Sequence, residues 1–346
     1  MPEGTIYSQR LGAIGEAQFE AVAARFNLGR FLKAEPTISG LFGQNVFVTT
    51  SEGDFVLRGA PHWVKELNET EHRREDRWQF GKEKFFARQL HERTKTPVPW
   101  PMLHDEASDI FGWPYLIMPR MPGQCFDERS IRKALEPPDR HGVAAALGEM
   151  LAEMQTLTWP FAGDFGRTSI ALEPYPGGAP VWTIDETHAM VNAADKNGSM
   201  TADDFAWIEA LAEQARNAAG GRPNTYVHCD YKLNNLTVSK DTGAWRVSGL
   251  FDLHEARFAD GALDVVRQAC SYLDTDVALA RVFVESYRAA TPLDRTLRER
   301  LPLYIVNDRM KFWQYFTSPN TLAEWTKGKT FRGWAQRYMD GMLALL

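Results

Sequence analysis

The chain has 346 residues, of which 44% are hydrophobic and 24% are charged, and its formal net charge is −6. This balance excludes an intrinsically disordered, collagen-like or low-complexity protein, since such chains carry few apolar residues or a strong compositional bias. The length fits one large two-lobed unit or two domains. No apolar run approaches the roughly 20 residues that a membrane-spanning helix requires. The mild acidity argues against nucleic-acid binding.

Three cysteines, Cys125, Cys229 and Cys270, lie far apart in the sequence and form no Cys-x-x-Cys pair. Their odd number and wide spacing predict neither a disulfide framework nor a zinc site. The first 16 residues contain no continuous apolar segment, so we expect no signal peptide. Together these features predict a cytoplasmic protein in a reducing compartment, without membrane association.

The first predicted elements are a helix and a hairpin. Apolar residues at helical spacing predict a helix over residues 15–26. The β-rich runs QNVFVTT (residues 44–50) and DFVLR (residues 54–58) flank Ser51-Glu52-Gly53. Two such runs around a short glycine-containing turn predict an antiparallel hairpin.

A helical region and a short strand follow the hairpin. The charged stretch 65–77 is predicted to be a solvated loop or helix, and residues 79–93 are predicted to form a helix. Prolines at positions 97, 99 and 101 end this helix because they lack a backbone N–H. The run WPYLIM at 113–118 predicts a buried strand, and Met-Pro-Gly at 121–123 breaks the chain.

The predicted elements after this break are mostly helices. Residues 143–157 and 202–219 have helical patterns. The second helix begins after Thr201 and carries Asp204 three residues later, in the spacing of a capping box, and it ends at two glycines. A β segment over residues 226–251 interrupts the helices, which resume from about residue 263.

This order of elements predicts two lobes with a cleft between them. The small β-rich N-lobe is expected over residues 1–120, and the larger, mostly helical C-lobe over residues 121–346. The fold class is therefore α+β.

The most informative segment is YVHCDYKLNNL, residues 226–236. It contains His228-x-Asp230-x4-Asn235, and seventeen residues after Asn235 comes Asp252, at the end of a predicted strand. The carboxylate of Asp230 can orient an acceptor hydroxyl and take its proton, while Asn235 and Asp252 offer hard oxygen ligands that suit Mg²⁺. This layout is that of kinase-type phosphotransferases, which need an aligned acceptor and cations on the phosphate oxygens.

On these residues the sequence resembles the aminoglycoside phosphotransferase and choline kinase branch of the protein-kinase-like fold, over roughly residues 38–266. His228-Cys229-Asp230 takes the place of that family's His-Gly-Asp, with Cys for the usual Gly. The resemblance implies a bilobal protein-kinase-like fold, Asp230 as the catalytic base, and Asn235 and Asp252 as magnesium ligands. His228 would then support the loop rather than react.

Two neighbouring positions leave alternatives open. Lys232, counted with Asp230 as catalytic, could contact the γ-phosphate as a compact cation, or it could face solvent. The family usually has an acidic residue two positions after the metal-binding Asp, where this sequence has His254 followed by Glu255. The resemblance therefore leaves open whether one or two metal ions bind.

The resemblance also implies a nucleotide site in the N-lobe. The run SGLFGQN, residues 39–45, resembles the family's glycine-containing phosphate loop and supplies Gly40, Gly43 and Asn45 as nucleotide-binding residues. Glycines let backbone N–H groups approach phosphate oxygens, although an ordinary turn would have the same composition. Arg58 holds the place of the phosphate-pairing lysine. Glu83 is its expected partner, unless it is one of several surface acids of its helix.

Residues 116–123, LIMPRMPG, resemble the hinge between the lobes. In such hinges a carbonyl accepts from the adenine amine, and an N–H two residues later donates to the ring. Pro119 keeps its carbonyl and Met121 its N–H, so Met118, Pro119 and Met121 are predicted to bind the nucleotide. Asp264, twelve residues after Asp252, matches a family position that ties the active loop to the following helix.

The final helices usually bind the acceptor in this family, so their charge is informative. Residues 295–346 contain nine basic and four acidic residues, an excess of five positive charges. Aminoglycosides are polycations, which favour an acidic pocket. A basic segment instead fits a neutral or anionic acceptor, unless these residues only cover a solvated helix face.

The same segment carries nine aromatic residues, which could stack on a ligand, cage a quaternary ammonium group or form the packing core. They are Tyr304, Phe312, Trp313, Tyr315, Phe316, Trp325, Phe331, Trp334 and Tyr338.

In addition, DYKLNNL (residues 230–236) is similar to the loop of kinase-like domains related to acyl-CoA dehydrogenases, which act on hydroxyacyl acceptors attached to coenzyme A.

These features predict a kinase that uses ATP, or GTP as the alternative, with Mg²⁺. Its acceptor would be a small-molecule hydroxyl of an antibiotic, sugar, amino alcohol or hydroxyacyl compound, and the protein would be a monomer or homodimer. Cys229 and His254 keep open a rival, a nucleotide-binding regulator that has lost catalysis. A protein kinase is disfavoured, because no long activation segment ending in Ala-Pro-Glu follows Asp252.

Overall fold

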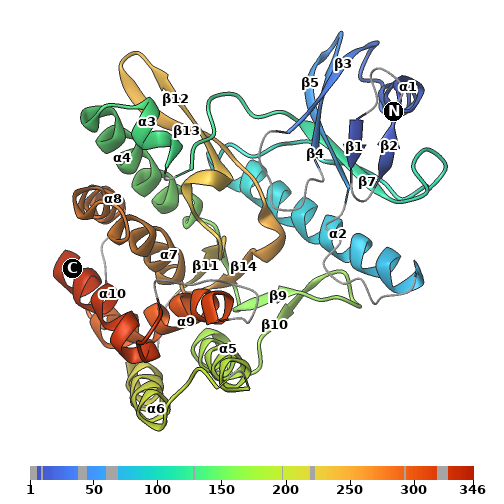
Figure 1. Cartoon of the computed structure of the whole chain (residues 1–346). Helices are drawn as coiled ribbons and strands as arrows, with labels where there is room; N and C mark the ends of the chain where they lie inside the picture. The colour runs from blue at the N-terminus through green and yellow to red at the C-terminus, as the bar shows by residue number, and fades with distance from the viewer. Residues whose placement is uncertain are drawn as a thin grey trace.

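A computed structural model describes residues 6–8, 11–37, 45–59, 69–127, 129–196, 198–218, 223–291, 294–317 and 326–346. The N-terminal part is rich in strands, and the C-terminal part consists mainly of helices (Figure 1). This arrangement confirms the predicted α+β class. None of the described helices is both long and apolar enough to span a membrane.

The N-terminal part is built on an antiparallel five-stranded sheet. Its strand order is β3-β4-β5-β7-β6. The strands are β3 (Phe31–Pro36), β4 (Asn45–Thr50), β5 (Gly53–Gly59), β6 (Leu103–Asp105) and β7 (Tyr115–Pro119). The β4–β5 hairpin closes at the Thr50–Gly53 pair, as the sequence predicts. Alternating residues of β4, among them Val46 and Val48, are buried against α1 (Glu16–Arg25) in a separate small core. Two short strands, β1 (Ile6–Ser8) and β2 (Gly12–Ile14), precede α1.

The helix α2 (Glu69–Arg93) runs beneath this sheet toward β9 (Gly163–Phe165) (Figure 1). The sequence predicted only its second half as a certain helix, because the first half is so highly charged that no apolar stripe stands out. Two side chains of α2 contact β9. The indole of Trp78 donates to the carbonyl of Phe165 at 2.7 Å, and the Lys82 ammonium lies 2.6 Å from the carboxylate of Asp164.

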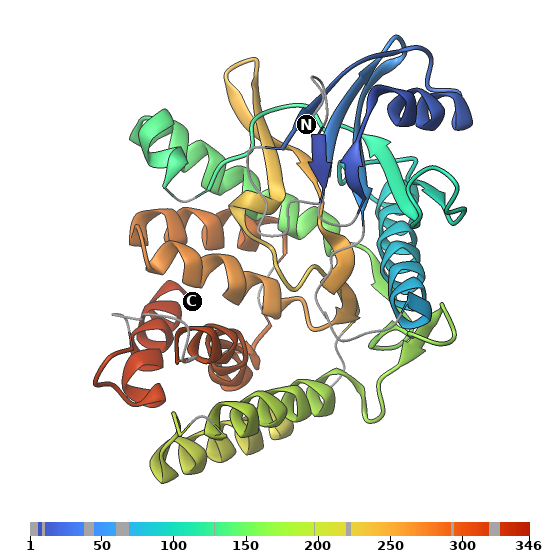
Figure 2. The same cartoon turned by 45° about the vertical axis from the view of Figure 1, so that its right-hand side comes forward.

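The C-terminal part combines helices with a small second sheet. The helices are α3 (Ser130–Ala134), α4 (Pro137–Met154), α5 (Gly178–Asp195), α6 (Ala202–Ala218), α7 (Ala262–Leu273), α8 (Val277–Ala290), α9 (Leu297–Thr317) and α10 (Phe331–Leu345). The sheet has the order β10-β9-β14-β11-β8, with β8 (Thr158–Trp159), β10 (Leu172–Pro174), β11 (Asn224–Val227) and β14 (Arg257–Ala259). The hairpin of β12 (Leu236–Asp241) and β13 (Ala244–Leu250) follows β11. Helices α5 and α6 lie at the end of the molecule opposite the N-terminal sheet (Figure 2).

Local signals explain which elements the sequence predicts. The capping box of α6 is present, because Asp204 Oδ2 accepts from Thr201 N at 3.0 Å and Thr201 Oγ1 accepts from Asp204 N at 3.2 Å. Strands of two or three residues, such as β8 and β9, are too short to show alternation and were not predicted. Helix α5 was also missed, since its first residue is a glycine with positive φ rather than a capping side chain.

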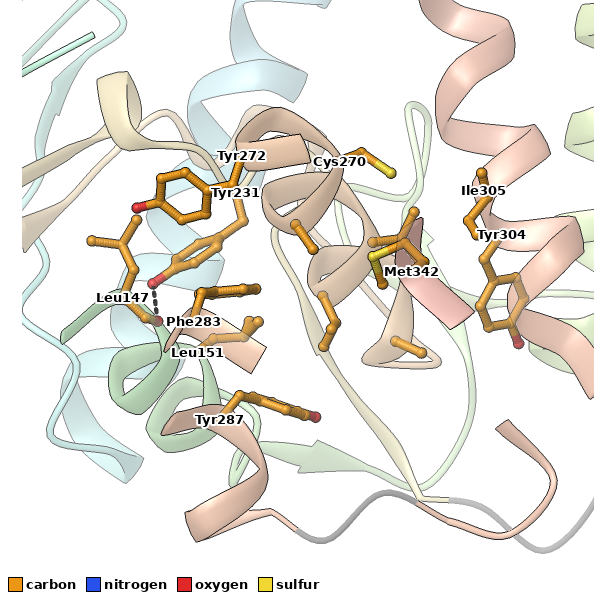
Figure 3. Close-up of a cluster of buried hydrophobic side chains, with 14 of the residues drawn as sticks. Leu147, Leu151, Tyr231, Cys270, Tyr272, Phe283, Tyr287, Tyr304, Ile305 and Met342 are labelled. Atoms are coloured by element: carbon orange, nitrogen blue, oxygen red, sulfur yellow. Dashed lines mark hydrogen bonds between the residues drawn. The ribbon is translucent and has the colours of Figure 1, made fainter. Parts of the chain in front are cut away.

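The main core forms where α8 packs against α4 and α7 (Figure 3). Leu147 and Leu151 of α4 meet Phe283 and Tyr287 of α8 in this cluster. Gly148 lies at the closest approach of the two helices. A Cβ atom there would sit only 2.9 Å from the backbone nitrogen of Tyr287 and would also press on the carbonyl of Phe283.

We therefore expect Gly148→Ala to destabilise the protein by about 1–3 kcal/mol, although Gly→Ala normally stabilises a helix. The physical reason is that the new methyl group meets backbone atoms, which cannot move aside as a side chain can. Urea unfolding followed by circular dichroism measures the effect. Gly15→Ala is the control, because nothing lies within 4 Å of an added Cβ there. Equal stability of both variants would contradict this account of the α4–α8 contact.

Candidate active site

The loop of residues 228–235, between β11 and β12, carries the Asp230 and Asn235 positions of the sequence motif. The carboxylate of Asp264, in the first turn of α7, accepts hydrogen bonds from the backbone N–H groups of His228 (2.6 Å) and Cys229 (2.8 Å). The buried His228 ring accepts from the backbone N–H of Asp230 through Nδ1 (3.3 Å), so its Nε2 donates to the carbonyl of Phe251 (3.0 Å). These bonds anchor the loop to α7 and to the end of β13, the supporting role predicted for Asp264 and His228.

The backbone of this loop has a conformation at Cys229 that favours glycine, the residue that the family resemblance leads us to expect there. Cys229 has φ of 66°, in the left-handed region, where a side chain costs about 1–2 kcal/mol. The two hydrogen bonds to Asp264 offset this cost. A third anchor is Tyr231, whose buried hydroxyl donates to the carbonyl of Leu147 at 2.8 Å (Figure 3). The loop is thereby held on both sides of Asp230.

The carboxylate of Asp230 contacts three donor side chains. Arg267 of α7 reaches Oδ1 through Nη2 (2.9 Å) and Nε (3.2 Å). Lys232 Nζ lies 2.6 Å from Oδ2, and Asn235 Nδ2 donates to the same oxygen at 2.9 Å. Burial raises the pKa of Asp230, but the charges of Arg267 and Lys232 outweigh burial and hold the pKa below its ordinary value. The carboxylate is therefore ionised throughout the neutral range.

Asn235 and Asp252 are the residues predicted to hold a magnesium ion. The backbone N–H of Phe251 donates to the carbonyl of Asn235 at 3.2 Å, which brings the residue before Asp252 against Asn235. Asn235 uses its Nδ2 on Asp230, which leaves its side-chain oxygen for a cation. The described residues contain no group of three or more His, Cys, Asp or Glu side chains that could hold a metal. Two oxygens suit Mg²⁺ that keeps phosphate and water ligands.

Arg58 joins the two parts of the molecule at this point. Its Nη2 lies 3.1 Å from Glu83 Oε1 and 3.3 Å from Asp252 Oδ1, so the Arg58–Glu83 contact expected from the sequence is present. Both members of that pair are buried, with 7% and 1% exposed. Burial lowers the pKa of Arg58, but Glu83 and Asp252 more than compensate and raise it. The guanidinium is a fixed positive charge beside Asp252.

His254 contacts the same carboxylate. Its Nδ1 lies 2.8 Å from Asp252 Oδ1, and its Nε2 lies 3.4 Å from Glu255 Oε1. Burial lowers the pKa of His254, but the two carboxylates outweigh burial and raise the pKa to about 10. His254 and Arg58 in turn overcome the effect of burial on Asp252 and hold its pKa well below the usual range. The residue that replaces the family's second acid is therefore a cation at neutral pH.

The predicted nucleotide-binding residues are described only in part. Gly40 and Gly43 lie outside the described residues. Asn45 begins β4 opposite Arg58 on β5, and its buried side-chain oxygen has no hydrogen-bond partner within the described structure. Met118 and Pro119 end β7, which pairs with β5, and the Met121 side chain packs near Gly249 of β13. Asn45 and the predicted hinge therefore flank β5, the strand that carries Arg58.

Helices α7 and α9 supply two charged residues near Asp230, Arg267 and Asp308, whose role the sequence did not predict. Asp308 of α9 lies 3.8 Å from Arg267 Nε, and the Arg267 guanidinium lies 4.8 Å from the centre of the Phe312 ring. Arg267 follows Asp264 by three residues, so helical spacing from that predicted anchor would have pointed to it. Most of the aromatic residues form the packing core instead. The buried ones are Tyr304, Trp313, Phe331, Trp334 and Tyr338.

Comparison with known proteins identifies the class to which this arrangement belongs. The family model of the phosphotransferase enzyme family matches residues 34–301. No curated protein matches the sequence. The chain belongs to the phosphotransferase enzyme family, and it is a kinase-like member of it.

Solved structures show the same fold. A candidate aminoglycoside phosphotransferase of Ralstonia eutropha is 15% identical, with a TM-score of 0.61 over 94% of this chain and 98% of that one. Aminoglycoside phosphotransferase APH(4)-Ia is 16% identical, with a TM-score of 0.58 over 95% and 98%. The GDP complex of aminoglycoside 2'-phosphotransferase-IIIa is 14% identical, with a TM-score of 0.58 over 94% and 95%. These likenesses confirm the protein-kinase-like fold that the sequence predicts.

The contacts of His254 predict a pH-dependent contribution to stability. We expect His254→Gln to lower the free energy of unfolding at pH 7 by about 3 kcal/mol, because it removes a buried charge between two carboxylates. The pKa of His254 is raised on folding, so its contribution is fully present below about pH 6.5 and is lost as the pH rises through about 10. Urea titrations of both proteins at pH 7 and pH 10.5 measure the difference.

His188→Gln serves as the control for this experiment. His188 contacts Glu209 at 3.0 Å in a more exposed pair, so its loss should cost about 1 kcal/mol or less. If the effect of His254→Gln were the same at both pH values, His254 would be a neutral hydrogen-bonding residue and the charge assignment would be wrong.

Proposed function

We propose that this phosphotransferase is an ATP-dependent kinase that phosphorylates a hydroxyl group of a small molecule. One observation carries the proposal: Asp230 contacts the Asn235 amide, the Asn235 carbonyl accepts from the residue before Asp252, and Asp252 contacts Arg58 of the N-terminal sheet. An ionised base, two oxygen ligands and a fixed cation are the parts that phosphoryl transfer requires. They come from segments almost 200 residues apart in the sequence.

In the proposed reaction the acceptor hydroxyl lies against Asp230. Its oxygen forms a bond to the γ-phosphorus while the bond from that phosphorus to the β,γ-bridging oxygen breaks, and ADP leaves with the electron pair. The hydroxyl proton passes to the Asp230 carboxylate, which Arg267 and Lys232 keep ionised and oriented. The low pKa of Asp230 suits a loose transition state, in which the acceptor hydroxyl need not lose its proton early.

Asn235 and Asp252 would hold Mg²⁺, which supplies neutralisation of charge on the phosphate oxygens. Arg58, fixed by Glu83, would pair with the phosphates of the nucleotide. Asn45, Met118, Pro119 and Met121 are the proposed nucleotide contacts among the described residues. One structural neighbour is a ternary complex of streptomycin, ATP and APH(2")-IIa, whereas others are GDP complexes, so GTP stays the alternative nucleotide.

Replacing the proposed base tests the reaction. We expect Asp230→Asn to reduce acceptor-dependent ADP release by about 10²–10⁴-fold, because the amide cannot accept the hydroxyl proton. A coupled assay with Mg-ATP and a panel of hydroxyl compounds measures the rate. The control Asp139→Asn removes a remote surface carboxylate that contacts Lys240 and should leave the rate unchanged. Equal rates in wild type and Asp230→Asn would refute the assignment of the base. Stabilisation by Mg-ATP without transfer to any compound would favour the regulator.

A second variant tests the metal ligands. We expect Asp252→Asn to weaken Mg-ATP binding roughly tenfold or more, because the carboxylate charge that faces the cation is lost. Isothermal titration calorimetry measures the affinity with Mg²⁺ and again with EDTA. The two proteins should bind metal-free ATP alike. An equal loss of affinity in EDTA would show that Asp252 acts on the protein structure and not through the metal.

A further inference from the structure

The surroundings of Asp230 on the acceptor side are basic and aromatic. The Arg267 guanidinium lies between the carboxylates of Asp230 and Asp308 and over the Phe312 ring. The Arg267 side chain is 11% exposed, so it is a fixed part of the surroundings of Asp230 and not a mobile surface group. Arginine held in this way presents its remaining donors in a fixed direction.

Two carboxylates on or beside α9, those of Asp308 and Glu186, are already paired with cations or amides of the protein. Asp308 contacts Arg309 through Nε (2.9 Å) and Nη2 (2.5 Å). Glu186 of α5 lies 3.3 Å from Arg257 and accepts from Asn307 at 2.9 Å. A polycation would have to displace these groups to find an anionic partner, which costs a large part of any attraction.

Lys311 differs from these paired groups. It lies on α9 one turn after Asn307 and Asp308, on the face that contacts α5 and α7. The side chain is exposed, and within the described part of the chain no carboxylate lies within ion-pair distance of its ammonium group. Burial raises the pKa of Cys229 and of Asp264, and the positive charge of Lys311 opposes that rise.

We propose that the acceptor is a hydroxy compound with an anionic group, a carboxylate or a phosphate, which Lys311 binds while Arg267 supports it from α7. This inference rests on the proposed kinase function and adds the substrate class. An anion at Lys311 gains a charge-assisted contact that no described carboxylate competes for, and Arg267 and Lys232 offset its repulsion from Asp230.

The test compares acceptors of matched size and different charge. ADP release is measured with glycerol 3-phosphate and glycerate as anionic probes, glycerol as the neutral probe and kanamycin as the polycation. We expect the anionic probes to have the highest kcat/KM. Lys311→Glu should lower that value about 10–100-fold, mainly through KM, and Lys311→Arg should restore most of it. Lys327→Glu, the same charge change at an exposed position beyond α9, should have little effect.

A binding measurement separates failure of this inference from failure of the proposed function. Calorimetric titration of the two anionic probes into nucleotide-free protein should show binding that Lys311→Glu abolishes. If no probe gives turnover but this binding holds, the anion site stands, and the panel of hydroxyl compounds used with Asp230→Asn decides the kinase proposal. A higher kcat/KM for kanamycin or glycerol, or anion binding that Lys311→Glu leaves unchanged, would refute the proposal that the acceptor is anionic. Binding and turnover of only one anionic probe would decide between phosphate and carboxylate.

Discussion

The site depends on one buried carboxylate. Asp264 accepts the backbone N–H groups of His228 and Cys229, and these two bonds hold the 228–235 loop in a conformation that includes a left-handed residue. Without them, residue 229 would relax toward an ordinary backbone conformation and Asp230 would turn with it. Backbone N–H groups that are buried must find acceptors, so the loop and the first turn of α7 specify each other. The position of the proposed base thus follows from a helix that begins more than thirty residues later.

A line of charged contacts runs from the N-terminal sheet to the acceptor side. It begins at the Glu83–Arg58 pair, passes through Asp252 and His254, and continues through Glu255 to Arg257. From there it reaches Glu186 on α5 and Asn307 on α9. Each cation lies between two acceptors, and the carboxylates Asp252 and Glu255 each contact two cations, so neighbouring charges of opposite sign alternate along the line. This arrangement places the proposed phosphate-pairing residue and the helices α5 and α9 in one electrostatic network.

Charge pairing also clarifies the basic C-terminal segment. Arg300 and Arg309 are buried and neutralised by aspartates, so they stabilise the packing of α9 and do not project toward a ligand. Lys311, by contrast, is exposed on the same helix. Two of the nine basic residues in this segment therefore serve the packing of the helix, and the other seven are exposed. The fold of the phosphotransferase family is kept, while the chemistry of the surroundings of Asp230 differs from what a polycationic acceptor would favour.

The sequence by itself determined the α+β class, the β4–β5 hairpin, the capping box of α6 and the residues of the motif from His228 to Asp252. These features are local, because spacing along a strand, a helix or a loop is written in consecutive residues. The sequence predicted the Arg58–Glu83 pair only through a family resemblance. The contacts of Arg267 with Asp230, of His254 with Asp252 and of Lys82 with Asp164 came from the tertiary structure alone. Packing decides which charged groups meet, since side chains distant in sequence have no periodicity that relates them.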